Sequence, residues 1–356
     1  MEDRLRFGLI GSGSQGRYLS ESLRILGQAE LVACADPNEE AARQAVRQCG
    51  YDRAYAQAGE MLAREGLDAV IVATTHDQLQ PNALAAVRAG KHVFVEKPMA
   101  LTAESGWELV EGAREAGVKL MVGYTFRFLP ERVYLKRLLD QGAVGEMAHV
   151  MAGQVIGRMR GWLASAEHGG GPLLYVGTHV IYQVLHVVER RVERVHAQVT
   201  WDEDSGVEKE ALMTMCFEDG VVAQVVTSQR LGGRYGWLDV LGSAGRVRAE
   251  WESPFIYVES QALEAYRHPT LIRVPEHWQL PVVVPGAQVS LNAFRYTPAW
   301  SAEFADFLGA IREDREPAVT GEDGVRVLEI TDAVFQSGRT GQAVTLRQMQ
   351  LPWHQV

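Results

Sequence analysis

The sequence predicts an α/β protein in which a doubly wound parallel sheet is followed by an α+β domain with a large, open, mostly antiparallel sheet. In the first third of the chain, apolar strand-like runs alternate with helical patterns, which indicates parallel pairing. Later strand-like runs are joined by short hairpin turns, which indicates antiparallel pairing. The length of 356 residues suits two domains with separate cores.

The first domain is expected to span residues 1–123. Gly27 and Gly90 follow helical patterns at the position of a helix stop signal, and Thr102 is a suitable N-cap for a helix that runs to about Ala116. Buried strands are predicted at residues 5–10, 30–36, 68–73, 92–95 and 119–123. Strands and helices in this order predict a doubly wound sheet.

The second domain is expected to span residues 124–356. A helix is predicted from about Glu131 to Gln141, and another from about Leu173 to Val188. Strands are predicted at residues 195–201, 211–217, 221–228, 237–241 and 246–251. The prolines between Pro254 and Pro285 predict a long irregular excursion. Two final helices, at about 300–312 and 321–338, could pack back on the first domain.

Composition narrows the class of protein. There are 35 basic and 45 acidic side chains, so the net charge is −10, which disfavours nucleic acid and anionic membrane surfaces as partners. The start of the chain lacks the pattern of a signal peptide, and no apolar run approaches the roughly 20 residues of a membrane span. The three cysteines are an odd set without a close pair, and we expect no disulfide framework and no metal site. A soluble, cytoplasmic protein is expected.

A glycine-rich turn after the first strand predicts a dinucleotide site. Asp36 ends the second strand 20 positions after the last glycine of the turn. There it can accept hydrogen bonds from the adenosine ribose, and its charge would repel a 2′-phosphate, which favours NAD over NADP. Asp36 could instead cap the helix that follows it. The turn has G-x-G-x-x-G spacing and consists of Gly11, Ser12, Gly13, Ser14, Gln15 and Gly16.

The second motif is Glu96-Lys97-Pro98, directly after a buried strand. Ligands of open α/β sheets bind beyond the carboxyl ends of such strands. The ammonium group of Lys97 could bond a substrate hydroxyl and stabilise the negative charge that develops on that oxygen as hydride leaves the carbon. The alternative is a solvated surface lysine.

These motifs, with the surrounding segment 89–102, resemble the glucose-fructose oxidoreductase / inositol dehydrogenase / rhizopine catabolism (Gfo/Idh/MocA) family. Further segments that resemble the family lie at 74–78, 127–130, 142–145, 169–171 and 321–324. The resemblance implies that Lys97 lies beside the nicotinamide, often with a cis peptide before Pro98, and that Thr74, Thr75 and His76 belong to a cofactor-contacting loop with Glu96. It also implies a homodimer or homotetramer formed through the exposed sheet of the second domain.

Four ring-bearing side chains share one face of the predicted helix from about Leu173, namely Tyr175, His179, Tyr182 and His186. An imidazole can take or return the hydroxyl proton near neutral pH, and the family resemblance around Gly177-Thr178-His179 assigns this role to His179. Family members usually carry aspartates where this chain has Tyr175 and Tyr182. A phenol can donate a hydrogen bond but holds no charge at neutral pH. Tyr175 is a candidate donor or acid, with packing as the alternative.

These residues predict an NAD-dependent oxidoreductase acting on a CH–OH group of a sugar, polyol or related hydroxyl-rich small molecule. Lys97 and His179 would have acid/base roles, with Tyr175 as the third catalytic candidate. Tyr124, Arg127, Trp162 and Tyr182 are candidates for lining the substrate pocket. The alternative is a non-catalytic NAD-binding sensor or regulatory protein of the same fold, because the two tyrosines replace the usual carboxylates. A third reading is an oxidoreductase for a non-sugar substrate such as an imine or dihydrodiol.

Overall fold

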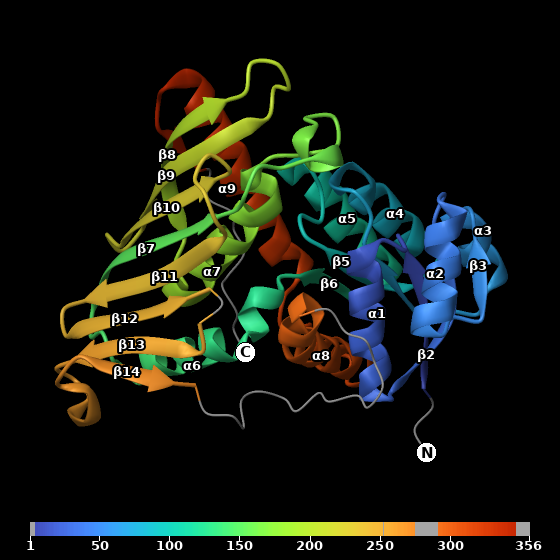
Figure 1. Ribbon diagram of the computed structural model, residues 1–356, viewed down its shortest axis with the longest axis horizontal. Helices are drawn as coiled ribbons and strands as arrows, with labels where there is room; N and C mark the ends of the chain where they lie inside the picture. The colour runs from blue at the N-terminus through green and yellow to red at the C-terminus, as the bar shows by residue number, and fades with distance from the viewer. Residues whose placement is uncertain (1–3, 252, 275–290, 347–356) are drawn as a thin grey trace. The chain divides into compact units, whose positions relative to one another are not determined.

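The computed structural model describes residues 4–251, 253–274 and 291–346 (Figure 1). The chain divides into two compact units, Met1–Phe128 with Gln279–Val325, and Leu129–Trp278 with Arg326–Val356. Each unit has its own sheet and its own apolar core.

The first unit contains the parallel sheet that the sequence predicts, with six strands instead of the five expected. In order across the sheet, the strands are β3 (Arg53–Tyr55), β2 (Ala29–Ala35), β1 (Leu5–Ile10), β4 (Ala69–Val72), β5 (His92–Glu96) and β6 (Leu120–Gly123). The central strand β4 is apolar throughout and inaccessible to solvent, as expected for a strand covered on both faces. The short strand β3 and the helix after it were not predicted from the sequence.

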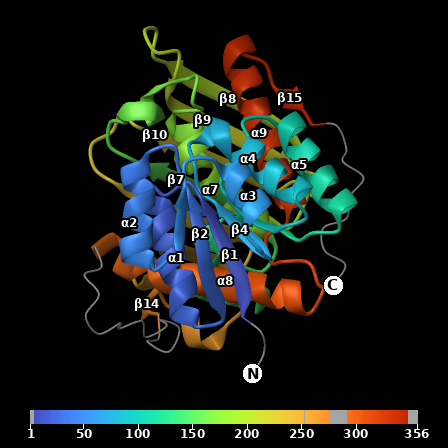
Figure 2. The ribbon, with the colours of Figure 1, turned by 90° about the vertical axis from the view of Figure 1, so that its right-hand side faces the viewer.

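Helices lie on both sides of this sheet (Figure 2). They are α1 (Ser14–Leu26), α2 (Glu39–Cys49), α3 (Ala58–Arg64), α4 (His76–Arg88), α5 (Ala103–Ala116), the short 3-10 helix η1 (Thr125–Phe128) and α8 (Leu291–Arg312). Thr102 caps α5 as predicted, because its hydroxyl accepts the N–H of Ser105 at 3.2 Å.

Helix α8 completes the core of the first unit. The ring of Phe304 lies 4.7 Å from that of Phe94 on β5, and the ring of Phe307 lies 6.3 Å from that of Phe7 on β1. The predicted start of this helix, near Trp300, is wrong, because α8 begins at Leu291 and continues through Pro298. Proline disfavours the helical conformation of the residue before it, so the sequence pattern predicts a later start.

The second unit contains a nine-stranded sheet. In order across it, the strands are β14 (Thr270–Arg273), β13 (Phe255–Ser260), β12 (Gly245–Glu250), β11 (Tyr235–Gly242), β7 (Met147–Val155), β10 (Val222–Ser228), β9 (Glu208–Phe217), β8 (Val192–Trp201) and β15 (Val344–Thr345). All neighbours are antiparallel except β7 and β10, so the predicted mostly antiparallel sheet is confirmed.

Helices of the second unit pack on this sheet (Figure 1). Helix α6 (Pro130–Asp140) packs against β12 and β13, and α7 (Thr178–Val188) packs against β7 and β10. Helix α9 (Gly321–Thr340) begins in the first unit and continues in the second, where Ser337 accepts the N–H of Ala197 on β8 at 2.8 Å. The short 3-10 helices of this unit are η2 (Gly161–Ala164) and η4 (Glu264–Tyr266).

Two expectations about the second unit need correction. The segment after Pro254 is not irregular up to Arg273, because β13 and β14 form a hairpin there. Pro254 precedes β13 and Pro269 lies between the two strands, so neither proline interrupts a strand. The remaining prolines of this stretch, from Pro275 on, lie outside the described residues. The helix from about Leu173 is also not α-helical throughout, since its first turn is the π-helical turn η3 (Leu173–Gly177).

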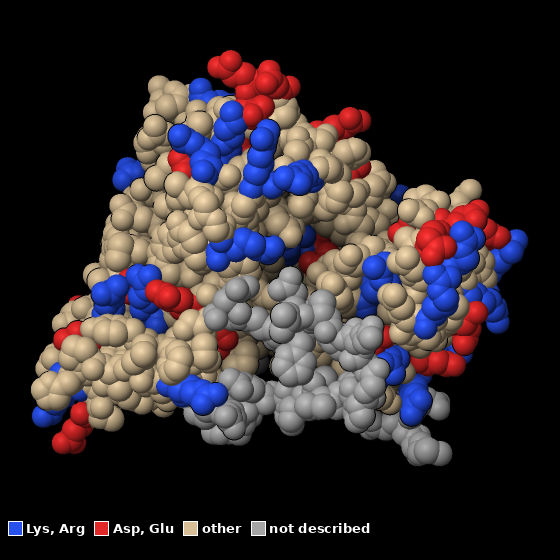
Figure 3. Space-filling model, viewed as in Figure 1, with Lys and Arg blue, Asp and Glu red and all other residues tan. Residues whose placement is uncertain are grey.

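Charged side chains of both signs are interspersed on the face shown in Figure 3. Several cations are paired, including Arg246, whose Nε donates to the buried carboxylate of Asp239 at 2.7 Å. Within the described part of the chain, no helix is both long enough and apolar enough to cross a membrane.

Candidate active site

The glycine turn between β1 and α1 has the geometry of a phosphate-binding loop. Gly11 has φ of 93°, and a Cβ there would lie 2.4 Å from the carbonyl oxygen of Ala73. A Cβ on Gly16 would lie 2.1 Å from the carbonyl oxygen of Gly11, so α1 can approach the turn only without a side chain. Beside Gly13, in contrast, there is open space within 4 Å. The turn therefore fits a pyrophosphate, which can approach the backbone at Gly13 and the first N–H groups of α1, for which a helix offers no internal acceptor.

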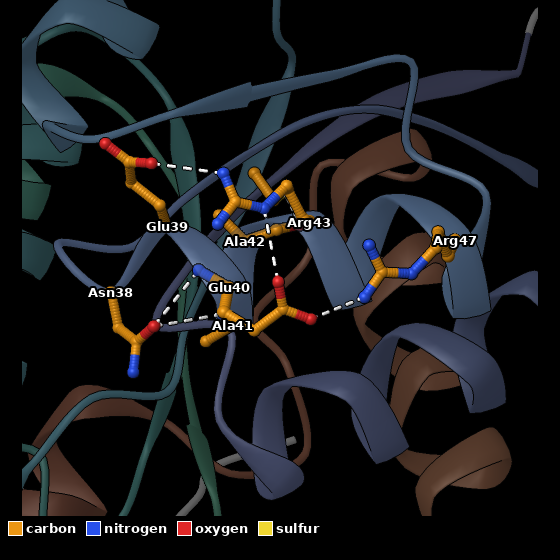
Figure 4. A network of polar contacts seen from close by, with 8 residues as sticks. Asn38, Glu39, Glu40, Ala41, Ala42, Arg43 and Arg47 are labelled. Atoms are coloured by element: carbon orange, nitrogen blue, oxygen red, sulfur yellow. Dashed lines mark hydrogen bonds and ion pairs between the residues drawn. The ribbon is translucent and has the colours of Figure 1, made fainter.

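Asp36 is held at the edge of this turn. Its two carboxylate oxygens accept the N–H of Ser12 and the N–H of Asn38, each at 2.8 Å. The sequence left open whether Asp36 caps the next helix. The cap is Asn38, whose side chain accepts the N–H groups of Glu40 and Ala41 (Figure 4).

Figure 4 shows how α2 is stabilised without Asp36. Arg43 bonds Glu39 and Glu40, at 3.1 and 3.2 Å, and Arg47 bonds Glu40 at 2.6 Å. Because the helix end is satisfied in this way, the Asp36 carboxylate keeps its remaining lone pairs for a ligand such as ribose hydroxyls.

The segment Thr74-Thr75-His76 lies against the glycine turn. A Cβ on Gly11 would come within 2.9 Å of the backbone nitrogen of Thr74, so the two segments are in direct contact. Thr75 stands at the N-cap position of α4, and His76 is its first residue and is buried. The structure thus places these three residues after β4, next to the glycine turn.

The Glu96-Lys97-Pro98 motif lies at the carboxyl end of β5, and the Lys97–Pro98 peptide is cis, as the family resemblance implies. Glu96 accepts the side-chain N–H of Gln15 from the glycine turn at 2.6 Å and the backbone N–H of Lys97 at 3.1 Å. The motif is therefore tied directly to the predicted cofactor turn.

Both side chains of this motif are buried, which changes their acidities. Burial lowers the pKa of Lys97 to about 8, against the opposite effect of Glu96. Burial raises the pKa of Glu96, against the effects of Lys97 and Gln15. Lys97 is only 9 % exposed, so it is not a solvated surface lysine, and its acidity suits proton transfer near neutral pH.

A third buried acid, Glu303 on α8, was missed by the sequence analysis. One oxygen of its carboxyl accepts the Thr125 hydroxyl at 3.0 Å, and the other has no hydrogen-bond partner among the residues that the structure describes. Burial, and next the negative charge of Glu96, raise the pKa of Glu303 well above its ordinary value. A signal existed, because Glu303 lies on the same helical stripe as Trp300 and Phe307, where apolar residues are expected.

Two pocket candidates follow β6 in the first unit. Tyr124 is fully buried directly after the strand, and Arg127 lies in η1 and is half-buried. Both stand at the carboxyl end of the sheet, the end at which β5 presents Lys97.

The other candidates lie in the second unit. His179 is 9 % exposed in the first turn of α7, and Gln183 donates to its carbonyl oxygen at 3.4 Å. Tyr182 is buried and its ring stacks on that of His186 with centroids 6.1 Å apart. Trp162, in η2, is half-buried.

Tyr175 lies in the π-helical turn, so the regular spacing that would align it with His179 does not hold. The i→i+5 bonding of a π turn widens the helix and rotates the residues before it relative to those after it. The Tyr175 ring packs against a small apolar cluster of Ile156, Met159 and Val176. Tyr175 therefore has a packing role in this unit.

A buried carboxylate at the start of this helix was also missed. Glu208, the first residue of β9, accepts the N–H of Leu173 at 2.7 Å. Burial raises its pKa to about 7, against the effect of backbone N–H donors. Sequence alone offers little signal here, because Glu208 and Leu173 are joined only by the tertiary fold.

The first unit thus combines a glycine turn fitted to pyrophosphate, an acid placed for ribose hydroxyls and a buried lysine at the end of β5. These features define a dinucleotide-binding protein with a potential proton-transfer group. The protein-family model described as "oxidoreductase family, NAD-binding Rossmann fold" matches residues 5–124, and the family model described as "GFO/IDH/MocA C-terminal domain" matches residues 133–248. The chain belongs to the Gfo/Idh/MocA oxidoreductase family, and its first domain is an NAD-binding Rossmann domain.

Several characterised proteins are similar along nearly their full length. Myo-inositol 2-dehydrogenase of Thermotoga maritima is 25% identical over 97% of this chain and 99% of its own. The NAD(+)-dependent scyllo-inositol 2-dehydrogenase of Bacillus subtilis is 26% identical, with 97% of each chain covered. Levoglucosan dehydrogenase in complex with NADH has the same fold, with a TM-score of 0.88 at 22% identity over 98% of this chain and all of its own.

Proposed function

We propose that this protein is an NAD-dependent dehydrogenase or reductase that transfers hydride between the nicotinamide C4 and a carbinol or carbonyl carbon of a sugar or polyol. Relatives of full-length similarity named for inositols support this class of substrate. The single observation that carries the proposal is the 2.6 Å bond between Gln15 of the glycine turn and Glu96, next to buried Lys97. It supports a lysine held beside the cofactor.

In oxidation, Lys97 would donate a hydrogen bond to the substrate oxygen and stabilise the charge that develops there. NAD, when bound, accepts the hydride. Glu96 lies next to Lys97 in a buried site. Its negative charge would keep the lysine oriented and favour the charged form of the lysine. Because burial lowers the pKa of Lys97 to about 8, this lysine can change protonation near neutral pH.

We propose that His179 takes up the hydroxyl proton during oxidation and returns it during reduction. Its position in the first turn of α7 and its slight exposure support a group that reaches substrate from a rigid helix. Tyr175 remains a proposed hydrogen-bond donor, and Trp162 and Tyr182 remain proposed pocket residues together with Tyr124 and Arg127.

We propose that NADP is disfavoured, with Asp36 as the discriminating residue. Its fixed carboxylate would accept ribose hydroxyls and repel a 2′-phosphate. A preference of the purified protein for NADPH over NADH would contradict this assignment.

The test of the proposed function compares Lys97→Ala with the control Lys91→Ala. Lys91 lies before the same strand and donates to the carbonyl oxygen of Leu67. Turnover with myo-inositol, scyllo-inositol or levoglucosan should fall by about 10²-fold or more in the first variant and stay unchanged in the second. NADH titration by fluorescence should give similar affinity in both. Unchanged turnover of Lys97→Ala would remove its proposed role.

A second candidate function is a non-catalytic NAD-binding sensor. It is favoured by the packing of Tyr175 into an apolar cluster and the burial of Tyr182, where a substrate-orienting carboxylate is absent. The sensor predicts tight NADH binding by the wild type without hydride transfer to any member of a broad polyol panel. Measured turnover would exclude it.

We also propose a homodimer or homotetramer formed through the nine-stranded sheet. Strand register places four exposed apolar side chains on the face opposite to α6 and α7, namely Leu212, Tyr235, Phe255 and Leu271. Leu271 is 65 % exposed. Light scattering that finds a monomer at micromolar concentration would contradict the proposal.

A further inference from the structure

Glu208 sits beneath the turn that leads into the helix of Tyr175 and His179. Its side chain is buried, and one carboxylate oxygen accepts the N–H of Leu173 at 2.7 Å. A Cβ on Gly171 would lie 2.3 Å from each of the two carboxylate oxygens. The carboxylate therefore fills the space next to Gly171 and anchors a turn whose glycines have no side chains of their own.

Gln229 extends this anchor to the preceding loop. Its side-chain N–H donates to the carbonyl oxygen of Glu208 at 3.0 Å, and its side-chain oxygen accepts the N–H of Met159 at 3.1 Å. Glu208 and Gln229 thus hold both ends of the segment 159–173, which contains Trp162.

The anchored turn determines where Tyr175 lies. The backbone N–H of Tyr175 donates to the carbonyl oxygen of Gly171 at 3.1 Å, and its side chain packs against the apolar cluster that contains Met159. The π turn that contains Tyr175 leads without a break into α7, where His179 is the second residue. Movement at Gly171 is therefore transmitted to both side chains.

The negative charge of Glu208 is stabilised by backbone N–H donors and by the positive end of the helical segment that begins at Leu173. Among the described residues, no cation is paired with it. On β9 itself, Lys209 and Glu210 follow Glu208. Of the elements packed against this strand, η3 carries Tyr175 and β10 carries no charged side chain, whereas β8 carries Glu193, Arg194 and His196. Lys209 is paired with Asp202 at 2.8 Å, and Glu210 with Arg230 at 3.1 Å.

We propose that Glu208 is a positioning residue, whose ionised carboxylate fixes the glycine turn and so sets Tyr175 and His179, and whose protonation loosens that turn. The role of these two side chains rests on the proposed function, whereas the anchoring itself does not. An ionised acceptor forms a hydrogen bond about twice as strong as a neutral one, so loss of the charge weakens the bond from Leu173.

Local order and global stability should then respond to pH in opposite directions. Burial raises the pKa of Glu208 to about 7, above that of the unfolded chain. Its contribution to stability is present below the unfolded pKa, near 4.3, and is lost as pH rises through about 7. The ionised form that orders the turn is thus the form that lowers the stability of the fold. A merely structural hydrogen bond would not give these opposite trends.

The experiment compares the full-length wild type with Glu208→Gln and with the control Glu210→Gln. Hydrogen exchange of amides 171–179, corrected for the intrinsic effect of pH, is measured at pH 6 and pH 8, and kcat/KM is measured across the same range. We expect wild-type protection of Leu173 to fall about tenfold at pH 6. Glu208→Gln should show the lower protection at both pH values, lower kcat/KM and no acid-side decline near pH 7. Glu210→Gln should match the wild type.

The measurements separate two kinds of failure. Wild-type protection that does not change between pH 6 and pH 8 would overturn the role of Glu208, and it needs no variant. Protection that changes as expected in a wild type without turnover would overturn the proposed function instead. A Glu208→Gln variant with a wild-type pH profile would also overturn the positioning role.

Discussion

Replacing Gly13 by alanine should weaken NADH binding and leave the fold intact. Gly13 has φ of −63° and ψ of −177°, a conformation that alanine adopts without strain. Apart from its neighbours in the chain, no heavy atom of the described residues lies within 4 Å of an added Cβ. The methyl group would therefore project into the space through which a pyrophosphate approaches the backbone.

The size of the effect follows from the contrast with Gly16. At Gly16 an added Cβ would lie 2.1 Å from a backbone oxygen, so the backbone must move, at a cost of about 1–3 kcal/mol. That loss corresponds to roughly 2–4 °C in Tm per kcal/mol. Gly13→Ala should change the free energy of unfolding by no more than about 0.5 kcal/mol. Its NADH affinity should nevertheless fall about tenfold or more, which is about 1.4 kcal/mol.

The assay is fluorescence titration with NADH beside thermal unfolding, with Gly59→Ala as the control. Gly59 is exposed in α3 and also has open space around its missing Cβ. In a helix, alanine is favoured over glycine by roughly 0.5–1 kcal/mol, so this control should be slightly more stable and bind NADH normally. If Gly13→Ala binds NADH as tightly as the wild type, the glycine turn is not where the pyrophosphate lies.

Two further predictions concern carboxyl groups of the first unit. Asp36→Ala should lower NADH affinity about tenfold and reduce the preference for NADH over NADPH, because the acceptor for the ribose hydroxyls is lost. Titrations of wild type and variant with both cofactors measure this, and an unchanged preference would refute the prediction. Glu303→Gln should remove part of the pH dependence of stability, because the pKa of Glu303 is raised by burial and by Glu96. The contribution of Glu303 to stability is present below its unfolded pKa and lost as pH rises toward its folded pKa, so the wild-type Tm should fall relative to the variant between pH 5 and pH 8. The Gln amide oxygen can still accept the Thr125 hydroxyl, so the variant removes the ionisation and keeps the hydrogen bond. Wild-type and variant curves of Tm against pH that run parallel would therefore contradict this prediction.

The parts of the fold that sequence predicted best are those specified by local patterns. The glycine turn, Asp36 and the apolar strands depend on neighbours along the chain, and the parallel pairing of the five predicted strands follows from their order. The parallel pair β7 and β10 could not be predicted in this way, because hairpin signals report only on consecutive strands.

The site residues divide along the same line. Lys97 is part of a motif that can be recognised in the sequence. Glu303 and Glu208, in contrast, are contacted by segments far away in the chain. Glu303 meets Thr125, and Glu208 meets Leu173. The π turn at Leu173–Gly177 also escaped prediction, since periodicity of apolar residues does not distinguish one π turn from α-helix.

The place of α8 in the first core has a consequence for how the chain is made. Phe94 emerges from the ribosome long before its partner Phe304, and strands β7 to β14 of the second unit are synthesised between them. At 5–20 residues per second, the first core waits on the order of 10–40 s for its last helix. During that time the apolar surface of β1 and β5 under α8 lacks its final cover. A fragment that stops at Phe128 would keep this uncovered surface permanently, and should aggregate or bind chaperones.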